Sequence, residues 1–319
     1  MYYWLDLHTH LEWSIPINCI LESAEKEKLI NRLNSEIIWL YDFAQVFWMI
    51  SRCIKSANEF AYYVEKFLIN QFEWWAIYNE FRISPYNHVH IGWIDIDDII
   101  SNVIKWINSA YLKKWVIGKV IIEAARSYSY EHVEEVFSWT KKYYDWKYVV
   151  GFWIWWIEKN NDLWIYGKIF DNALDLWIPM TVHAWETWNI DNLKFCINQS
   201  WIKRIWHAVS YNQLNQIDKM TAKNKNKVIE VLISSNLALK HVTSIHKHHL
   251  LNMFNDWIKF TIWTDDSTLF KTSLKNELKQ LSMILEIDEY EYIKLNTLNS
   301  IESAFCDTKT KNYLMKKLI

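Results

Sequence analysis

Short apolar runs rich in β-branched and aromatic residues recur along the chain, and a longer segment with helical periodicity follows each of them. This alternation favours βα units around a parallel sheet, because the apolar face of each helix must be buried against the strands. We predict eight strands, at residues 3–7, 76–82, 119–124, 148–152, 178–183, 202–206, 228–233 and 258–264. Eight such units point to an α/β fold of the (β/α)8 TIM-barrel type, in which catalytic groups lie at the C-terminal ends of the strands.

Two long helical segments depart from the simple alternation. Residues 17–74 form an insert after the first predicted strand, and its amphipathic stretch FAYYVEKFLINQF predicts helices packed over one mouth of the sheet. After Asp266 we expect a helical C-terminal extension. No linker rich in Pro, Gly or Ser and no internal repeat divides residues 1–319, so we interpret them as a single domain.

The bulk composition is that of a globular chain with a large core, since 51% of the residues are hydrophobic and 23% are charged. Because 35 basic side chains balance 37 acidic ones, we expect no nucleic acid and no membrane surface as a partner. The longest apolar run, residues 148–157, is too short to cross a bilayer as a helix. Four scattered cysteines without a CxxC pair, and the absence of a signal-peptide pattern, favour reduced thiols and a cytoplasmic location.

Side chains able to bind a metal gather where the predicted strands end. They are His8 and His10 at the first strand, His183 with Glu186 at the fifth, His207 at the sixth, and Asp265 with Asp266 at the eighth. Residues two apart in extended backbone point to the same face, so His8 and His10 can hold one ion. Three histidines and a carboxylate from different strands can surround Zn²⁺ and leave a position for water, whose pKa then falls to near 7. The cluster therefore favours a catalytic metal site.

Several of these residues have an ordinary structural interpretation when each is taken alone. Asp265 and Asp266 are suited to cap a helix, and Glu186 is suited to the first turn of one. A single HxH pair is also a weak signal, because His88 and His90 form a second pair in a polar loop. We expect the side chains of that second pair either to be exposed to solvent or to support the metal ligands without binding the metal.

A third group of histidines, His246, His248 and His249, lies where a helix is expected to begin. We predict that this group lies at the surface.

Seven sequence blocks together resemble the adenosine deaminase family, which comprises zinc-dependent purine aminohydrolases on a (β/α)8 barrel. HTHLEWS at residues 8–14 resembles the family's HxHLDG or HLEG start, and YNEFRISP at 78–85 resembles its YxELRxSP strand. The remaining blocks follow in the family's order: VVGF at 149–152, TVHAWE at 181–186, RIWHA at 204–208, SSN at 234–236 and TIWTDD at 261–266. The match runs from the N-terminus to about residue 280.

The resemblance implies a zinc-dependent hydrolytic deamination of adenosine or deoxyadenosine, with inosine and ammonia as products of adenosine. The partner would be a small-molecule purine nucleoside or base, in the purine metabolism of nucleoside salvage. The implied ligands of the one Zn²⁺ per chain are His8, His10, His183 and Asp265.

The resemblance also assigns the remaining site residues. Glu186 would supply a proton to N1 of the purine, and His207 would orient or deprotonate the attacking water. Asp266 would meet N7, and the backbone at Trp156 would approach N3. Glu12 stands where adenosine-specific members commonly have an aspartate that reaches the ribose 5′ hydroxyl. A glutamate there resembles relatives that act on adenine or on modified adenosines, which is the alternative substrate class.

Glycine is almost absent from this chain, which has 4 Gly and 22 Trp. An average chain of this length would carry about 7% glycine, or roughly 22 residues. In nearly every family-like block a tryptophan occupies the family's glycine position, as in HLEWS, TVHAWE and RIWHA. Some bacterial lineages read the UGA codon as glycine, so we hypothesise that most of these tryptophans are glycines written under the wrong code. If the tryptophans are genuine, the chain would be a catalytically inactive metal-binding relative.

Two other enzyme classes fit the residues less well. If Trp is read as Gly, positions 151, 153 and 156 form a GxGxxG pattern with Asp175 about twenty residues on, which mimics a dinucleotide fingerprint. That pattern lies among strands that bear metal-binding side chains instead. Binuclear amidohydrolases need a bridging lysine at a strand end, and the sequence offers no convincing one.

Overall fold

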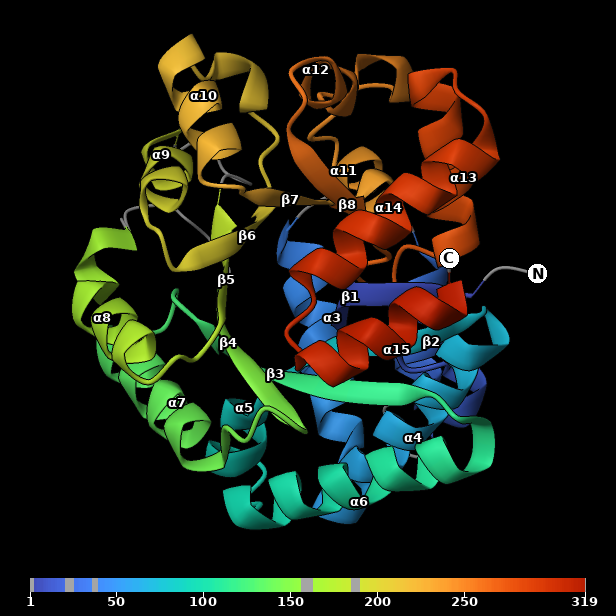
Figure 1. Cartoon of the computed structure of the whole chain (residues 1–319). Helices are drawn as coiled ribbons and strands as arrows, with labels where there is room; N and C mark the ends of the chain where they lie inside the picture. The colour runs from blue at the N-terminus through green and yellow to red at the C-terminus, as the bar shows by residue number, and fades with distance from the viewer. Residues whose placement is uncertain (1–2, 21–25, 36–39, 156–162, 185–189, 319) are drawn as a thin grey trace.

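The computed structural model describes residues 3–20, 26–35, 40–155, 163–184 and 190–318. Its centre is a parallel sheet of eight strands in the order β1 to β8 (Figure 1). The strands are β1 Trp4–His10, β2 Ala76–Ile83, β3 Ile117–Ala125, β4 Val149–Trp155, β5 Met180–Ala184, β6 Ile202–His207, β7 Val228–Val231 and β8 Lys259–Ile262. Each overlaps one of the predicted strands, which confirms the fold class.

Closure of the sheet into a barrel depends on the segment that follows β8. Asp265 forms a parallel bridge with Thr9 of β1. The Asp265 N–H donates to the carbonyl of His8 at 3.0 Å, and the His10 N–H donates to the carbonyl of Asp265 at 3.3 Å. Because of this bridge and of the pairing of His10 with Arg82 of β2, the first strand extends beyond the predicted residues 3–7 to His10.

Helices lie around the outside of the barrel (Figure 1). Their bounds are α1 Leu11–Ser14, α2 Lys26–Asn34, α3 Leu40–Cys53, α4 Ala57–Glu73, α5 Pro85–His90, α6 Ile96–Lys114, α7 Tyr130–Tyr143, α8 Gly167–Asp175, α9 Ile190–Asn198, α10 Gln216–Asn224, α11 Ile233–Ala238, α12 Leu250–Asn255, α13 Leu274–Leu285, α14 Glu289–Ser303 and α15 Thr308–Leu318. The predicted insert after the first strand contains α2, α3 and α4, and the predicted C-terminal extension contains α13, α14 and α15. Within the described residues, no helix has the length and apolar character needed to cross a membrane.

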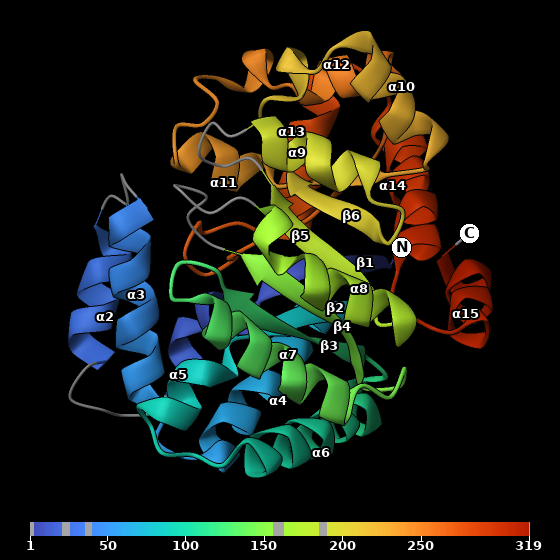
Figure 2. The same cartoon turned by 90° about the vertical axis from the view of Figure 1, so that its left-hand side faces the viewer.

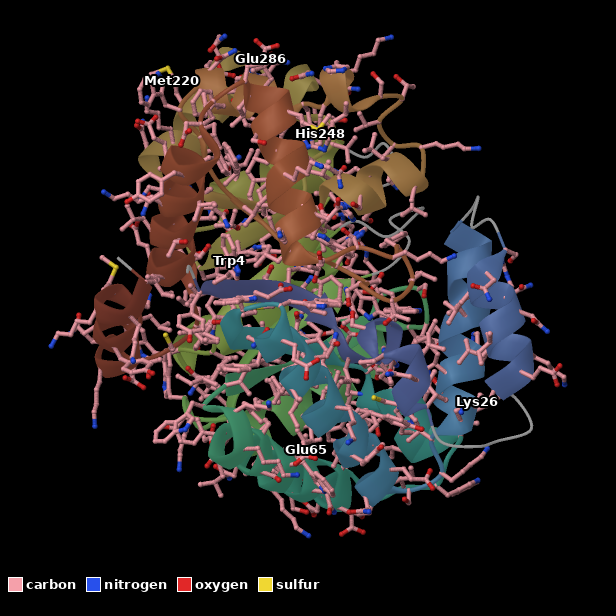
Figure 3. The ribbon with its side chains drawn as sticks, turned by 90° about the vertical axis from the view of Figure 1, so that its right-hand side faces the viewer. Trp4, Lys26, Glu65, Met220, His248 and Glu286 are labelled. Carbon is pink, nitrogen blue, oxygen red and sulfur yellow. The ribbon has the colours of Figure 1, made fainter. Side chains whose placement is uncertain are left out.

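Part of the insert lies over the C-terminal mouth of the barrel. Figures 2 and 3 show α2 and α3 as a pair at one end of the barrel, and Figure 3 labels Lys26, at the start of α2. From α3, the Phe47 ring lies 4.9 Å from the Trp13 ring in α1 and 6.3 Å from the Trp155 ring at the end of β4. These contacts confirm the expectation that insert helices pack over one mouth of the sheet.

A network of buried charges ties several strands together inside the barrel. Arg204 of β6 binds Glu80 of β2 at 2.6 Å and Glu230 of β7 at 3.1 Å. Arg82 of β2 lies 3.4 Å from the same Glu230 carboxylate. All four side chains are fully buried, so each charge needs its partners to offset the loss of hydration. The network fixes Glu230 in one orientation close to the mouth.

Tryptophan occupies an unusual share of the left-handed backbone positions. Among the described residues other than glycine, six of the thirteen with positive φ are tryptophan, at 75, 93, 115, 146, 177 and 257. All four glycines lie in the described part of the chain, and none of them has positive φ. For a residue with a Cβ, the left-handed conformation costs roughly 1–2 kcal/mol.

The ends of α8 and α12 show why the backbone turns left-handed there. Both helices end in a Schellman motif, with Trp177 donating to the carbonyl of Leu174 and Trp257 to that of Phe254, each at 3.0 Å. The residue at this position is most often glycine and sometimes asparagine. The same motif at the end of α10 does carry an asparagine, Asn226. Trp177 and Trp257 are 78% and 79% exposed, so little apolar burial offsets the strain.

We expect Trp257→Gly to raise the free energy of unfolding by about 1 kcal/mol, because glycine adopts the left-handed backbone without a Cβ penalty. The matched control is Trp139→Gly, within α7, where the indole is 9% exposed. That change should lower the free energy of unfolding by roughly 3–5 kcal/mol, since it leaves a cavity. Urea unfolding followed by circular dichroism measures both. Destabilisation by Trp257→Gly would contradict the strain argument.

Candidate metal centre and active site

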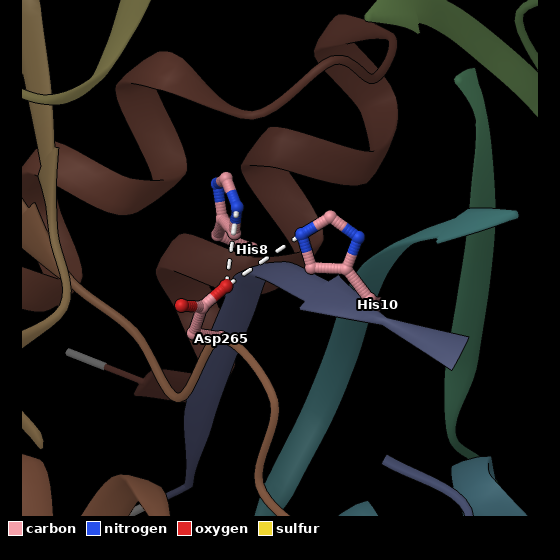
Figure 4. A group of neighbouring side chains, drawn as sticks. All are labelled: His8, His10 and Asp265. Atoms are coloured by element: carbon pink, nitrogen blue, oxygen red, sulfur yellow. Dashed lines mark ion pairs between the residues drawn. The ribbon is translucent and has the colours of Figure 1, made fainter. Parts of the chain in front are cut away.

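His8, His10 and Asp265 form a buried group at the C-terminal end of β1 (Figure 4). Asp265 Oδ1 lies 3.8 Å from His8 Nε2 and 3.6 Å from His10 Nε2. One ligand atom from each of the three side chains lies within 4.8 Å of the others. Strand geometry brings the histidines to one face, and barrel closure between β1 and the segment after β8 brings the carboxylate to them.

Two buried carboxylates orient the two histidines. His8 Nδ1 donates to Glu230 Oε2 and His10 Nδ1 donates to Glu123 Oε2, each at 3.0 Å. A hydrogen bond on Nδ1 leaves the Nε2 lone pair to face a cation, which is the usual arrangement of histidine ligands. Burial, with the nearby positive charge of Arg82, holds the pKa of His8 well below its ordinary value. His8 is therefore neutral and able to coordinate.

The donor set fits a divalent metal ion. His8 Nε2 is fully buried and makes no hydrogen bond within the described residues, although it faces a carboxylate. A buried polar atom without a hydrogen bond carries a free-energy cost that a bound cation would remove. Two imidazole nitrogens and one carboxylate oxygen are ligands suited to zinc and similar transition metals.

His183, the third histidine of the predicted ligand set, lies outside this group. It belongs to β5, and its Nδ1 accepts a hydrogen bond from Arg126 Nη2 at 3.4 Å. The Trp206 ring lies 4.1 Å from the His183 ring and 4.6 Å from the His8 ring, between centroids. The indole therefore occupies the space through which His183 would approach His8.

His207 ends β6 in strained backbone near the same mouth. Its φ is 61° and that of Ala208 is 44°, so two consecutive residues are left-handed. The His249 Nε2–H donates to the carbonyl of His207 at 3.1 Å. The ring of His207 lies 5.3 Å from that of His183, so the turn places this imidazole beside the predicted ligand. Strained backbone of this kind is concentrated at functional sites.

Glu12 and Asp266 are both fully buried near the metal group. Glu12, in α1, accepts a hydrogen bond from the Ser84 N–H at 3.0 Å, and His88 Nε2 lies 3.7 Å from the same oxygen. The Ser84 hydroxyl in turn donates to Glu123, so a chain of polar contacts connects Glu12 with the carboxylate that holds His10. Glu186 and Trp156, the other two predicted site residues, lie outside the described residues.

The other histidine groups differ in part from the expectations. His90 is exposed, but His88 is only 2% exposed and faces Glu12, which fits a role behind the site rather than a solvated one. The prediction of a surface group was wrong for His248 and His249, which are 3% and 2% exposed. They begin α12 as expected, but the chain before it runs inward toward β6, where His249 binds His207.

Glu123 and Glu230 are the functional side chains that the sequence analysis missed. Each is an acidic residue within an otherwise apolar strand, in VIIEAA of β3 and VIEV of β7. A carboxylate at a buried strand position needs a polar partner, and that signal was available in the sequence. Burial raises the pKa of Glu123 to about 8, against the lowering effects of the Ser84 hydroxyl and Arg82.

A cavity of about 250 Å³ lies beside the metal group, at the ends of β2, β3 and β4. Ser84, Glu123, Tyr128 and Trp155 are among the residues that line it. The Trp155 ring also lies 5.8 Å from the His10 ring, so this indole both lines the cavity and contacts the candidate metal ligand.

The dinucleotide pattern considered for residues 151–156 has no phosphate-binding turn at its first glycine. Gly151 lies inside β4, where it pairs with Ile121 of β3. A Cβ at this position would lie 3.0 Å from Phe305 and from the carbonyl of Pro179, so glycine serves close packing there.

The fold and the site are those of a (β/α)8-barrel enzyme with a metal-binding group at the C-terminal mouth. The adenosine deaminase family model matches residues 5–319. The chain is 27% identical over 326 aligned residues to an adenosine deaminase of Clostridium botulinum (strain 657 / Type Ba4), with 98% of this chain and 97% of that protein covered. The chain belongs to the adenosine deaminase family, and this membership supports a hydrolytic deaminase activity.

Solved structures of similar proteins share the fold. An adenine deaminase from Arthrobacter aurescens superposes with a TM-score of 0.88 at 17% identity, covering 100% of this chain and 98% of that one. An amidohydrolase from Burkholderia ambifaria with bound Zn gives a TM-score of 0.84 at 16% identity, covering 99% and 89%.

We expect Glu123→Gln to weaken binding of Zn²⁺ by about 10–100-fold, because it weakens the hydrogen bond that orients and polarises His10. The matched control is Glu135→Gln, since Glu135 also lies 3.0 Å from a histidine, His90, but in an exposed pair. The control should leave metal affinity unchanged. Competition with a chromophoric chelator measures both affinities, and equal losses in the two variants would contradict the assignment of His10 as a ligand.

Proposed function

We propose that the protein is a zinc-dependent deaminase that converts adenosine or deoxyadenosine to the corresponding 6-oxopurine nucleoside and ammonia. The observation that carries this proposal is the convergence of His8, His10 and Asp265 in one buried group. That group lies at the end of a barrel where enzymes of this fold place their catalytic side chains. Membership of the adenosine deaminase family and the zinc in a structural neighbour support the same reading.

Four side chains would hold the metal: His8, His10, His183 and Asp265. When bound, zinc lowers the pKa of water and so provides a nucleophile at neutral pH. Water adds to C6 of the purine, and the bond from C6 to the amino nitrogen breaks to release ammonia. Each chain would bind one zinc ion, and each turnover would consume one water molecule.

The remaining side chains would move protons and hold the substrate. His207 would take a proton from the water, which suits an imidazole near neutrality. Glu186 would protonate N1, Asp266 would bind N7, and the backbone at residue 156 would approach N3. The buried positions of His207 and Asp266 support these roles, because a site closed to bulk water strengthens such contacts.

Adenine or a modified adenosine is the alternative substrate class, and Glu12 is the reason to retain it. The Ser84 N–H donates to Glu12 Oε1 at 3.0 Å, and Glu12 Oε2 makes no hydrogen bond within the described residues, so what distinguishes this position is the longer side chain that replaces the family's aspartate. The fold is shared with an adenine deaminase from Arthrobacter aurescens.

The proposal is tested by measuring ammonia release from adenosine, deoxyadenosine, adenine and AMP. The protein used carries glycine in place of the tryptophans in the family-like blocks. We expect turnover to be highest with adenosine or deoxyadenosine. Asp265→Ala should abolish ammonia release, because it removes a metal ligand, while Asp175→Ala, at the end of α8, should leave it intact.

The outcomes separate the candidate functions. Turnover of adenine alone would replace the nucleoside with the base as substrate. Zinc binding without release of ammonia from any of the four compounds would indicate a metal-binding relative without catalytic activity.

A further inference from the structure

An indole ring fills the centre of the barrel mouth. The Trp206 ring centroid lies 4.1 Å from those of His183 and His207. It also lies 4.6 Å from the His8 ring and 5.7 Å from the His10 ring. One side chain is therefore in ring contact with all four histidines of the proposed site, in the volume that a metal ion and a substrate would need.

A second indole lies beside the first. The Trp153 ring centroid is 4.8 Å from the His10 ring and 4.8 Å from the Trp206 ring. Trp153 is fully buried, Trp206 is 4% exposed, and neither indole N–H makes a hydrogen bond within the described residues. Buried tryptophans ordinarily find a partner for this group. These two indoles therefore occupy the site without the hydrogen bond that a buried indole N–H ordinarily makes.

The backbone gives independent support, at tryptophans other than the two in the mouth. Tryptophan stands at six left-handed positions, and two of them, Trp177 and Trp257, complete Schellman motifs whose equivalent at the end of α10 is Asn226. Glycine is the residue that these positions favour, because it has no Cβ to meet the following carbonyl. Other tryptophans sit in ordinary helical backbone, among them Trp106 in α6 and Trp139 in α7.

We infer that the cell that makes this protein inserts glycine at eight of its tryptophan positions, reading UGA as glycine. The eight are Trp75, Trp93, Trp115, Trp146, Trp153, Trp177, Trp206 and Trp257. Left-handed backbone favours glycine at six of them, and the ring contacts in the mouth favour it at the other two. The amino-acid composition shows only that glycine is scarce, whereas the structure indicates at which positions glycine is favoured.

Glycine at 153 and 206 would make room in the mouth for the metal ion and the purine. This part of the inference rests on the proposed function. Removal of the Trp206 indole takes away a ring that contacts both His8 and His183, which leaves room for His183 to approach the metal-binding group. Removal of both indoles opens a binding space for a planar heterocycle, next to the existing cavity that Glu123 lines.

The direct test is the sequence of the gene and of the native protein. UGA at the eight codons, and peptides from the protein purified from its own cells that carry glycine at 153, 177, 206 and 257, would support the inference. UGG at these codons, or tryptophan in those peptides, would overturn it.

The functional test uses two forms of the full chain, one as printed and one with Trp153→Gly and Trp206→Gly. We expect the second to bind Zn²⁺ more tightly and to change from no detectable ammonia release to turnover of a purine. A third form, with Trp106→Gly, controls for the loss of an indole elsewhere and should gain neither property. A gain in metal affinity by the control equal to that of the mouth variant would overturn the assignment of 153 and 206.

The two tests distinguish failure of the inference from failure of the proposed function. Glycine in the native peptides together with no deamination of any purine would sustain the inference and remove the function. Tryptophan in the native peptides together with deamination by the native protein would do the reverse.

Discussion

Closure of the barrel between β1 and the segment after β8 is the constraint on which the site depends. The Asp265 N–H and carbonyl both bond to the β1 backbone, at His8 and His10. These two hydrogen bonds join residues more than 250 positions apart and place the Asp265 carboxylate less than 4 Å from both imidazoles. The backbone of Asp265 is left-handed, with φ 58°, so the site is held at a strained turn.

Buried charges extend this constraint around the barrel. Glu230 accepts hydrogen bonds from His8, from Thr181 of β5 and from Arg82, and it forms an ion pair with Arg204 at 3.1 Å. One carboxylate thereby connects four strands other than its own and also orients a candidate metal ligand. A side chain with this many partners cannot rotate freely, and a metal ligand held in one geometry loses little conformational freedom when a cation binds.

The tryptophans conflict with both the backbone and the site. Exposed indoles lie at helix ends where the left-handed turn favours glycine, and buried indoles lie among the histidines where a cation and a substrate need space. Tryptophan is thus unfavourable for the backbone conformation at the surface positions and for metal and substrate binding at the buried ones. One cause, a reassigned codon, accounts for both conflicts, whereas separate explanations would be needed if each tryptophan were native.

The sequence by itself determined the eight strands, the helical insert and extension, and the pair His8 and His10, because period-two alternation and apolar runs are local properties of a chain. It also marked Asp265 as following a strand and, through the family resemblance, as a metal ligand together with His8 and His10, but it did not indicate the backbone bridge between Asp265 and β1. Only the tertiary structure decided which further groups surround these ligands. It brought Glu123 and Glu230 behind the histidines, buried His248 and His249, and set the Trp206 indole against both His8 and His183. Such contacts join residues far apart in the chain, so they follow from strand register and barrel closure rather than from any local pattern.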